Sequence, residues 1–356
     1  MTSERSGLLL PIDATLCTGI DIGGTKITIA DTATAAVRHY DTIAYTGKGV
    51  DALLMDYFRA IGKRPRFIML AIAGPRDDET GAVQLTNADW PTFVPVDAAA
   101  SYPGTGFETT NDLTAAIAGV IGQSGIDLED IKPGTPAPTG TKLVVTLSTG
   151  INCAAAVWDA PTKRYSFVTC EAGHIGFQPK NSDELAYLDH LQQVSTAEHK
   201  HVSVELALSG KYGIESLTDH ILALHKTDTL AAAVKRARQA GRPTGAVLRE
   251  IAEQGDGNDR AVARIILHHL GNMIGSALRD YAVLFKATGG VYMTGSVSLG
   301  LADYFAKKTD FIKRFIHPGA AHSGWIERIP IYLVTDPYIT VRGALALARQ
   351  GVDAAG

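Results

Sequence analysis

The pattern of hydrophobic and polar residues near the N-terminus predicts a β-hairpin. An apolar run from Leu16 to Ile20 has the character of a strand, and Gly23-Gly24 follows it as a turn. Beyond the turn, Ile27 and Ile29 alternate with polar residues, which is the pattern of a half-buried returning strand. A strand–glycine turn–strand unit is therefore expected at the start of the chain.

The same pattern recurs in the middle of the chain. An apolar run from Leu143 to Leu147 is followed by the turn Ser148-Thr149-Gly150, and Cys153 to Trp158 can form the returning strand. Two similar hairpins in one chain could hold the phosphates of a nucleotide between them.

Further apolar runs predict the remaining strands and helices. Strands are expected over residues 67–73, 291–293 and 332–334, and helices over 113–121, 259–285 and 341–349. Asp259 stands where it can cap the long helix, and the prolines within residues 131–142 favour an exposed loop. Because strands and helices alternate throughout, the predicted fold class is α/β.

The size and composition of the chain are those of a soluble two-domain enzyme. It has 356 residues, more than a single hydrophobic core usually serves, of which 46% are hydrophobic and 20% charged. The formal net charge is −4 and no long basic run is present. Electrostatics therefore gives no reason to expect nucleic acid or a membrane surface as a partner.

The apolar segments and the cysteines indicate a cytoplasmic location. The run from Leu8 to Leu10 ends at Pro11 and is too short for a signal-peptide core, and no apolar segment approaches membrane-spanning length. Cys17, Cys153 and Cys170 are far apart in the sequence and odd in number. They form no disulfide framework and fit a reducing compartment.

The first hairpin carries the motif Asp21 to Lys26, which suits phosphate binding. Its two glycines let backbone N–H groups approach phosphate oxygens without an intervening Cβ, and Asp21 could hold Mg²⁺ through water. Thr25 and Lys26 add a hydroxyl group and a positive charge. In the second hairpin Thr149-Gly150 could donate to phosphate in the same way. Either segment, taken alone, could also be an ordinary β-turn.

A side-by-side amide and carboxylate, Asn111-Asp112, precede the helix predicted from Leu113. Asp112 stands at the position of a helix N-cap, and capping is a sufficient role for an isolated carboxylate there. The same position favours the ionised carboxylate, which could accept a proton from a hydroxyl group of a polyol. The two roles do not exclude one another.

Two more acidic motifs follow downstream. Glu171 and His174 stand three residues apart with Gly173 between them, so both side chains could converge on adjacent hydroxyl groups. The alternative for His174 is a structural histidine. Glu205 has apolar neighbours and could be a surface position on a helix, although Ser209 to Gly213 beyond it could line a nucleotide pocket.

The order of these motifs resembles that of the bacterial-type glucokinase family, within the sugar kinase/Hsp70/actin superfamily. The resemblance extends from about Cys17 to Gln350. The segments similar to family motifs are Asp21–Thr25 and Ser148–Gly150 for phosphate, Ala71–Pro75 with Leu85–Trp90 before the sugar site, Asn111-Asp112, Glu171–His174 and Glu205 for the sugar, and Gly289–Tyr292 for adenosine.

The resemblance implies a two-domain actin-like ATPase (ribonuclease H-like) fold with an interdomain cleft. The small domain would comprise residues 1–110 plus 336–356 and the large domain residues 111–335. Asp112 would be the catalytic base. Glucose would be bound by Asn87, Asn111, Asp112, Glu171, His174 and Glu205. ATP and Mg²⁺ would be bound by Asp21, Gly23, Gly24, Thr25, Lys26, Thr149, Gly150 and Gly295, with Asp21 facing the metal through water.

The implied activity is ATP-dependent phosphorylation of D-glucose to glucose 6-phosphate, the entry to glycolysis, by a homodimer. The alternatives are a kinase for another sugar or phosphoryl donor and a non-catalytic sugar sensor. A sensor is disfavoured because the candidate base is present and no helix-turn-helix extension precedes the first strand.

Three positions depart from the family pattern. The second phosphate loop of the family is richer in glycine, whereas here Ile151-Asn152 follows Thr149-Gly150, and the tolerance of Asn for positive φ would preserve the turn. Ser296 follows Gly295 in place of a second glycine, which would narrow the nucleotide pocket. Ala172 and Gly176 give the sugar motif a likeness to the related repressor–kinase group, whose zinc-binding cysteine cluster is not present here.

Overall fold

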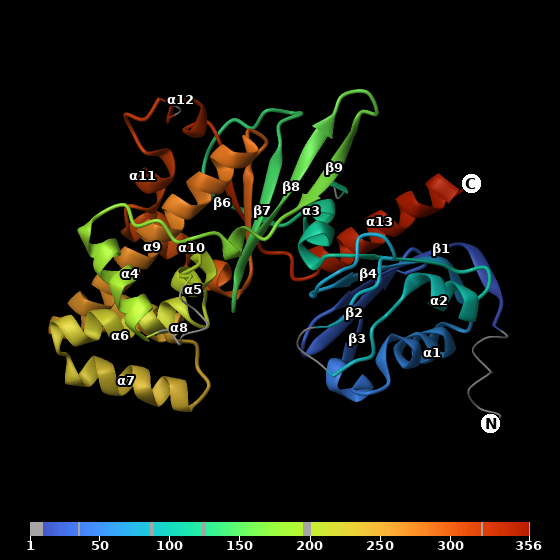
Figure 1. Cartoon of the computed structure of the whole chain (residues 1–356), viewed down its shortest axis with the longest axis horizontal. Coiled ribbons are helices and arrows are strands. Elements are labelled where there is room, and N and C mark those ends of the chain that lie inside the picture. The colour runs from blue at the N-terminus through green and yellow to red at the C-terminus, as the bar shows by residue number, and fades with distance from the viewer. Residues whose placement is uncertain are drawn as a thin grey trace. The chain divides into compact units, whose positions relative to one another are not determined.

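The computed structural model describes residues 10–34, 36–85, 89–122, 126–194, 201–321 and 323–355 (Figure 1). Residue contacts divide the chain into two units, Met1–Ile126 with Asp336–Gly356, and Asp127–Thr335. The first unit extends past the boundary expected at Thr110, because the helix after that residue packs within this unit. In the described part of the chain, no helix has the length and apolar character needed to cross a membrane.

The first unit is built on a five-stranded mixed sheet. Its strands are β1 (Ile12–Ile22), β2 (Lys26–Asp31), β3 (Arg38–Asp41), β4 (Arg64–Ile72) and β5 (Gly106–Thr110). They lie in the order β3-β2-β1-β4-β5. β2 is antiparallel to both of its neighbours, β1 and β3, whereas β1, β4 and β5 are parallel. The predicted N-terminal hairpin is therefore confirmed as β1 and β2.

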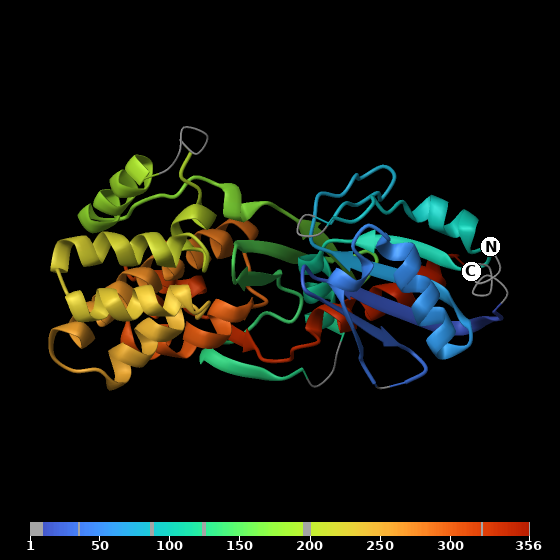
Figure 2. The same ribbon diagram turned by 90° about the horizontal axis from the view of Figure 1, so that it is seen from below.

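Helices cover both faces of this sheet (Figure 1 and Figure 2). They are η1 (Thr42–Tyr45), α1 (Gly49–Ile61), α2 (Pro95–Ser101), α3 (Asp112–Gly122) and α13 (Ile339–Ala355). Alternate residues of β4 pack to opposite sides: Ile68 and Leu70 join a cluster with α1, whereas Phe67 and Met69 join a cluster with α13. Burial of both faces explains why β4 reads as a continuous apolar run in the sequence.

α3 and α13 cross at unusually close range. A Cβ atom added at Gly343 would overlap the carbonyl oxygen of Ala115, and one at Gly119 would overlap that of Ile339. Two glycines therefore let the backbones of these helices touch. This crossing fixes α3, and hence its first residue Asp112, against the sheet.

The second unit repeats the strand order of the first. Its strands are β6 (Leu128–Lys132), β7 (Lys142–Leu147), β8 (Ile151–Asp159), β9 (Arg164–Thr169), β10 (Val291–Thr294) and β11 (Ile331–Val334). The sheet order is β6-β11-β10-β7-β8-β9. Five of its strands, in the order β9-β8-β7-β10-β11, correspond to β3-β2-β1-β4-β5 of the first sheet. β6 is an additional edge strand, antiparallel to β11. The two hairpins seen in the sequence are the first two strands of each copy.

The helices of the second unit gather around one long buried helix, α9. They are α4 (Ser182–Val194), α5 (Val204–Leu208), α6 (Gly213–His225), α7 (Asp228–Gln239), α8 (Thr244–Gln254), α9 (Gly257–Phe285), α10 (Ser296–Lys308), α11 (Phe311–Ile316) and α12 (Ser323–Ile326), with the short η2 (Ala172–His174). The apolar residues that predicted α9, including Ile266, Leu270 and Ile274, are fully buried in the core of this unit.

Two local predictions were wrong. α9 begins at Gly257 with Asp256 at its N-cap position, so Asp259 lies in the first turn rather than at the cap. The expected loop over residues 131–142 also fails at its start, because Lys132 pairs with Ile331 in β6. The apolar side chain of Ile131, buried in the core, outweighs the proline-rich composition that follows it.

Candidate active site

The turn between β1 and β2 has the tight geometry expected of the first phosphate motif. Gly23 N donates to Lys26 O at 3.0 Å, and a Cβ atom on Gly23 would lie 3.1 Å from that oxygen. Thr42 fastens the turn from outside, because its Oγ1 donates to Gly23 O at 2.7 Å and its N to Thr25 O at 3.1 Å. Gly24, Thr25 and Lys26 are exposed, so the turn presents its backbone to solvent.

Strand register brings Asp21 and Asn111-Asp112 to the same edge of the first sheet. Asp21 pairs with Ala71 of β4, and Ala71 pairs with Thr110 of β5. Asn111-Asp112 follows Thr110 directly and starts α3. Burial, and after it the charge of Asp112, raises the pKa of Asp21 to about 7, while a hydrogen bond from Thr28 opposes the shift.

The helix cap is made by Asn111 and not by Asp112. Leu113 N donates to Asn111 Oδ1 at 2.9 Å, and Ala115 N donates to Asn111 O at 3.0 Å, as expected of an N-cap residue. Asp112 is the first helical residue, and its Oδ1 also accepts from Leu113 N at 2.9 Å. The helix N-terminus still favours its carboxylate form.

The second hairpin turn lies at the corresponding edge of the second sheet. Ser148 N donates to Gly150 O at 2.8 Å and closes the turn, and Gly210 N donates to Ser148 O at 2.7 Å. Gly295 follows β10 at the same edge, since Thr294 pairs with Thr146. Its φ of 95° and the 2.6 Å between an added Cβ and Leu147 O both require glycine. Ser296 begins α10, and its predicted effect on the nucleotide pocket stays a prediction.

Glu205 lies against the second hairpin turn. It belongs to α5, whose N-cap Ser203 accepts from Leu206 N at 3.1 Å. The Oε2 atom of Glu205 accepts from Ile151 N at 3.2 Å, and an added Cβ on Gly150 would lie 2.5 Å from the same oxygen. The predicted sugar ligand Glu205 and the predicted phosphate residue Gly150 are therefore neighbours.

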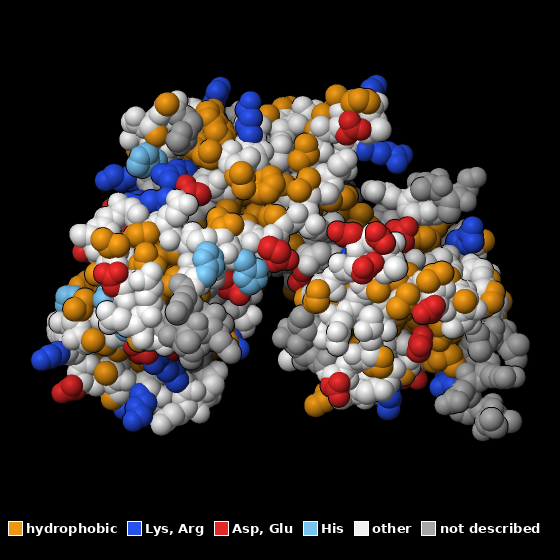
Figure 3. Space-filling view, in the orientation of Figure 1, with side chains coloured by type: hydrophobic (Ala, Val, Ile, Leu, Met, Phe, Trp, Pro, Cys, Tyr) orange, Lys and Arg blue, Asp and Glu red, His pale blue; other side chains and the backbone are white. Residues whose placement is uncertain are grey.

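Glu171 and His174 form the exposed part of the candidate sugar site. Glu171 Oε2 lies 3.8 Å from His174 Nε2, and their side chains are 72% and 65% exposed. Figure 3 shows histidine and acidic side chains next to one another on the visible face of the second unit. Between them, Gly173 packs so closely on Ile151 O that a Cβ atom would overlap it.

Asn152 is the residue that sequence reasoning misjudged. It lies in β8, paired with Thr146, and is not among the positive-φ positions of the described residues, so the turn is kept without the positive φ that was expected to preserve it. Its Nδ2 instead donates to Glu171 Oε2 at 3.0 Å. Only a contact between residues 19 positions apart reveals this role, and no local pattern could have predicted it.

Two cysteines are the sequence neighbours of Asn152 and Glu171. The Sγ atoms of Cys153 and Cys170 are 3.3 Å apart, since β8 and β9 bring together residues that are distant in the sequence. Cys153 is buried and Cys170 is half-buried. The hydrogen bond from Cys153 lowers the pKa of Cys170, and the same bond together with burial raises the pKa of Cys153.

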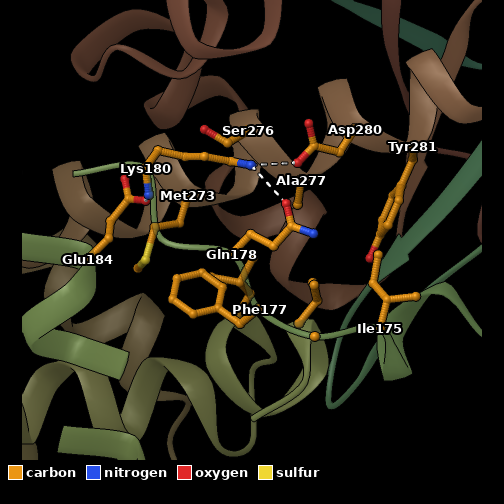
Figure 4. Close-up of a pocket in the computed structure, with 13 residues that line it drawn as sticks. Ile175, Phe177, Gln178, Lys180, Glu184, Met273, Ser276, Ala277, Asp280 and Tyr281 are labelled. Carbon is orange, nitrogen blue, oxygen red and sulfur yellow. Dashed lines mark hydrogen bonds and ion pairs between the residues drawn. The ribbon is translucent and has the colours of Figure 1, made fainter. Parts of the chain in front are cut away.

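A small cavity of about 100 Å³ backs the segment that follows His174 (Figure 4). Ile175 and Phe177 line it from this segment, and Met273 and Ala277 line it from α9. Lys180 closes one side of the cavity through an ion pair, in which its Nζ lies 3.1 Å from Asp280 Oδ2. The hydroxyl group of the buried Tyr281 donates to Ala172 O at 2.9 Å, so α9 supports the candidate sugar segment from below.

The structure thus groups the predicted residues within each unit. Asp21, the glycine turn, Asn111 and Asp112 gather in the first, and Thr149, Gly150, Glu171, His174, Glu205 and Gly295 belong to the second. Asn87, also predicted to bind the sugar, lies outside the described residues.

The chain is similar to known proteins over most of its length. A sequence model of the Glucokinase family matches residues 19–351. A glucokinase from Saccharophagus degradans is 30% identical over 294 residues, covering 81% of this chain and 82% of that protein. A glucokinase from an Antarctic psychrotroph has a similar structure, with a TM-score of 0.75 and 24% identity, covering 94% of this chain and 99% of that one. A ROK family glucokinase from Streptomyces griseus, in complex with glucose and AMPPNP, has a TM-score of 0.58 and 21% identity, covering 94% and 100%.

The duplicated strand order, with a hairpin turn at the carboxyl edge of each sheet, is that of the actin-like ATPase fold. The two structural relatives, both below 25% identity, bear on the fold alone. Since the family model spans nearly the whole chain and a relative of 30% identity covers most of it, the chain belongs to the glucokinase family.

Proposed function

We propose that this kinase transfers the γ-phosphoryl group of ATP to the 6-hydroxyl group of D-glucose, giving glucose 6-phosphate at the entry to glycolysis. The observation that carries the proposal is the register that sets Asn111 and Asp112 beside Asp21 at one sheet edge. A carboxylate for a sugar hydroxyl group is thereby adjacent to the candidate phosphate turn. The relative from Streptomyces griseus, solved with glucose and AMPPNP, supports the choice of both substrates.

The sugar would be held by side chains that complement its hydroxyl groups. Glu171 and Glu205 are acceptors for hydroxyl protons, His174 can accept or donate, and Asn111 offers an amide. Glu205 is already oriented by Ile151 N, which leaves little conformational entropy to lose when glucose binds. Asn87 would complete the set.

Asp112 would act as the general base. As O6 of glucose attacks the γ-phosphorus, the O6–P bond forms, the bond from phosphorus to the ADP oxygen breaks, and the O6 proton passes to the Asp112 carboxylate. In phosphoryl transfer the proton leaves late, so a base of ordinary strength at a helix N-terminus is adequate. Positioning and electrostatic stabilisation would supply most of the rate enhancement.

The phosphates of ATP would be held by the two hairpin turns. The backbone of Gly23 to Lys26 and that of Thr149 and Gly150 offer N–H groups, and Lys26 offers a positive charge. Gly295 would let the nucleotide approach the backbone at the end of β10.

Mg²⁺ suits the residues at this edge of the first sheet. Burial is the main cause of the raised pKa of Asp21 and the charge of the second carboxylate, Asp112, is the lesser one; a divalent cation would offset that charge. Asp21 would hold the ion through water, as Mg²⁺ keeps much of its hydration. When bound, Mg²⁺ neutralises charge on the β- and γ-phosphates. Asp21 itself only orients that hydrated ion.

A substrate panel tests the proposal. Glucose, mannose and glucosamine would each be offered with ATP, ADP and polyphosphate, and the phosphorylated carbon would be identified by NMR. We expect the highest kcat/KM for glucose with ATP, and the phosphate on O6. A higher value for another sugar or donor would replace the proposed substrates. Glucose binding without turnover would assign a sugar sensor instead.

We also propose a cytoplasmic homodimer. The family resemblance supports the dimer, and cysteine side chains present as thiols at Cys17, Cys153 and Cys170 are compatible with a reducing compartment. Light scattering should give twice the mass of one chain, and the mass of a single chain would refute the dimer.

A further inference from the structure

The side chain of Asn152 is fixed in one orientation by two backbone donors. Its Oδ1 accepts from Cys153 N at 2.9 Å and faces Gly173 N at 3.4 Å. Because two N–H groups face this atom, it must be the amide oxygen, and Nδ2 must point the other way. That nitrogen meets Glu171 Oε2 at 3.0 Å. The amide therefore presents its donor to the carboxylate with no freedom to flip.

Glu171 needs such a partner more than Glu205 does. Its side chain is 72% exposed, and the sequence places it before a short 3-10 turn rather than on a strand or long helix. An exposed glutamate samples several rotamers, and ordering them when the sugar binds costs free energy. Glu205, in contrast, is half-buried and is held by a hydrogen bond from Ile151 N.

We propose that Asn152 is a positioning residue that holds the Glu171 carboxylate in its sugar-binding orientation. The inference rests on the proposed function, because it takes Glu171 to be a glucose ligand. The Asn152 amide occupies one lone pair of Oε2 and leaves the remaining lone pairs of the carboxylate to accept sugar hydroxyl protons. His174, whose Nε2 lies 3.8 Å from the same oxygen, approaches from the loop side.

Asn152 also connects the sugar site to the second phosphate turn. It follows Ile151, whose N–H orients Glu205, and Gly150, which belongs to the predicted phosphate loop. Consecutive residues of β8 thus set both acidic ligands: Ile151 through its backbone and Asn152 through its side chain. A glycine at position 152 could not supply the second of these contacts.

Two substitutions at this position test the proposal. Asn152→Ala removes the donor, and we expect the KM and the Kd for glucose to rise about 10-fold or more, the effect of losing a hydrogen bond to a charged group. The KM for ATP should change by less than about twofold, since no ATP contact is lost. Steady-state kinetics and calorimetric titration with glucose in the absence of ATP measure these values.

Asn152→Asp gives a readout that a merely structural role would not. The introduced carboxylate would lie about 3 Å from Glu171 Oε2, and two carboxylates at that distance resist simultaneous ionisation. Glucose affinity in this variant should therefore fall as the pH rises from about 5 to 8, relative to the wild type. The ratio of the glucose affinities of the two proteins isolates the effect of position 152, because every other residue is the same.

Asn181 supplies a matched control. Its Nδ2 donates to Glu184 Oε1 at 3.0 Å and its Oδ1 accepts from Glu184 N at 2.9 Å, so it makes the same kind of contacts at the start of α4. Asn181→Ala should lower the melting temperature and leave the glucose KM unchanged. Wild-type glucose affinity in Asn152→Ala, or a rise in the ATP KM alone, would overturn the proposal.

The two proposals fail in distinguishable ways. If the wild-type protein binds glucose without phosphorylating it, the proposed function fails and calorimetry still tests Asn152. If the wild type phosphorylates glucose and Asn152→Ala binds it equally well, the positioning role fails and the function stands. A circular dichroism spectrum equal to that of the wild type shows that each variant is folded.

Discussion

Asp21 and Asp112 lie at one edge of the first sheet, and the charge of Asp112 contributes to raising the pKa of Asp21 to about 7. Burial is the larger cause. The raised pKa therefore reflects mainly the removal of Asp21 from water and, to a lesser extent, a neighbouring carboxylate, which makes Asp21 a candidate functional residue.

The difference in stability between the Asp21→Asn variant and the wild type should change in favour of the variant as the pH rises. The folded-state pKa of Asp21 lies above its unfolded value of 3.8. Between these values the unfolded chain binds fewer protons than the folded one, so wild-type stability falls as the pH rises from about 4 to 7. The asparagine variant lacks this dependence. Thermal melts at pH 5 and 8, with a chelator present, measure the difference.

The exposed Asp89 provides the control for this experiment. Asp89→Asn removes one exposed carboxylate from the same unit and so controls for the loss of one negative charge. If the stability difference between Asp21→Asn and the wild type does not increase with pH, the raised pKa of Asp21 is contradicted.

Asp112→Ala should lower kcat by about 10²–10⁴-fold, the range expected for loss of a general base. Glucose binding should weaken much less, because the other sugar ligands remain. The N-cap is retained in this variant, since Asn111 provides it. Single-turnover kinetics with ATP and calorimetry with glucose separate the two effects. A near-normal kcat would remove Asp112 from its catalytic role.

The sequence was sufficient for the features that depend on local pattern. Alternating apolar residues and glycine turns predicted β1–β2 and β7–β8, and helical periodicity predicted α9. Asp112 was predicted to be the N-cap, whereas Asn111 provides the cap. Asn and Asp are equally good N-caps, so the choice between these neighbours depends on where the preceding strand ends.

Contacts between distant segments could not be predicted in this way. The donor from Asn152 to Glu171 and the approach of Cys153 to Cys170 both arise from the pairing of β8 with β9 and the loop beyond it. The close crossing of α3 and α13 depends on Gly119 and Gly343, which are more than two hundred residues apart. Nothing in either local sequence indicates that its glycine meets the other helix.

Gly343→Ala should destabilise the first unit. The added Cβ would overlap Ala115 O, a backbone atom that cannot move without shifting α3. Overpacking of this kind typically costs about 1–3 kcal/mol. Gly324→Ala is the control, because no atom lies within 4 Å of its added Cβ. Urea denaturation measures the stability of both variants. Equal denaturation midpoints for the two would contradict the close packing of α3 against α13.

Gly150→Ala should weaken glucose binding with little loss of stability. The added Cβ would lie 2.5 Å from Glu205 Oε2, the end of a side chain that can move away. The displaced carboxylate would lose its bond from Ile151 N and its orientation toward the sugar, so we expect the glucose KM to rise about 10-fold. Gly300→Ala, where the added Cβ meets nothing within 4 Å, should leave the KM unchanged. Equal KM values for the two variants would contradict the contact.

Cys170 should react with iodoacetamide faster at neutral pH than an ordinary thiol, because the hydrogen bond from Cys153 lowers its pKa. Cys153→Ala removes this donor, so the pH midpoint of alkylation should rise toward the value of a free cysteine. The buried Cys17 serves as the internal control and should stay unmodified in both proteins while they are folded. Mass spectrometry of peptides taken at intervals between pH 6 and about 9 gives the rate at each cysteine. Identical pH profiles for Cys170 in the wild type and in Cys153→Ala would show that the neighbouring thiol does not stabilise the thiolate.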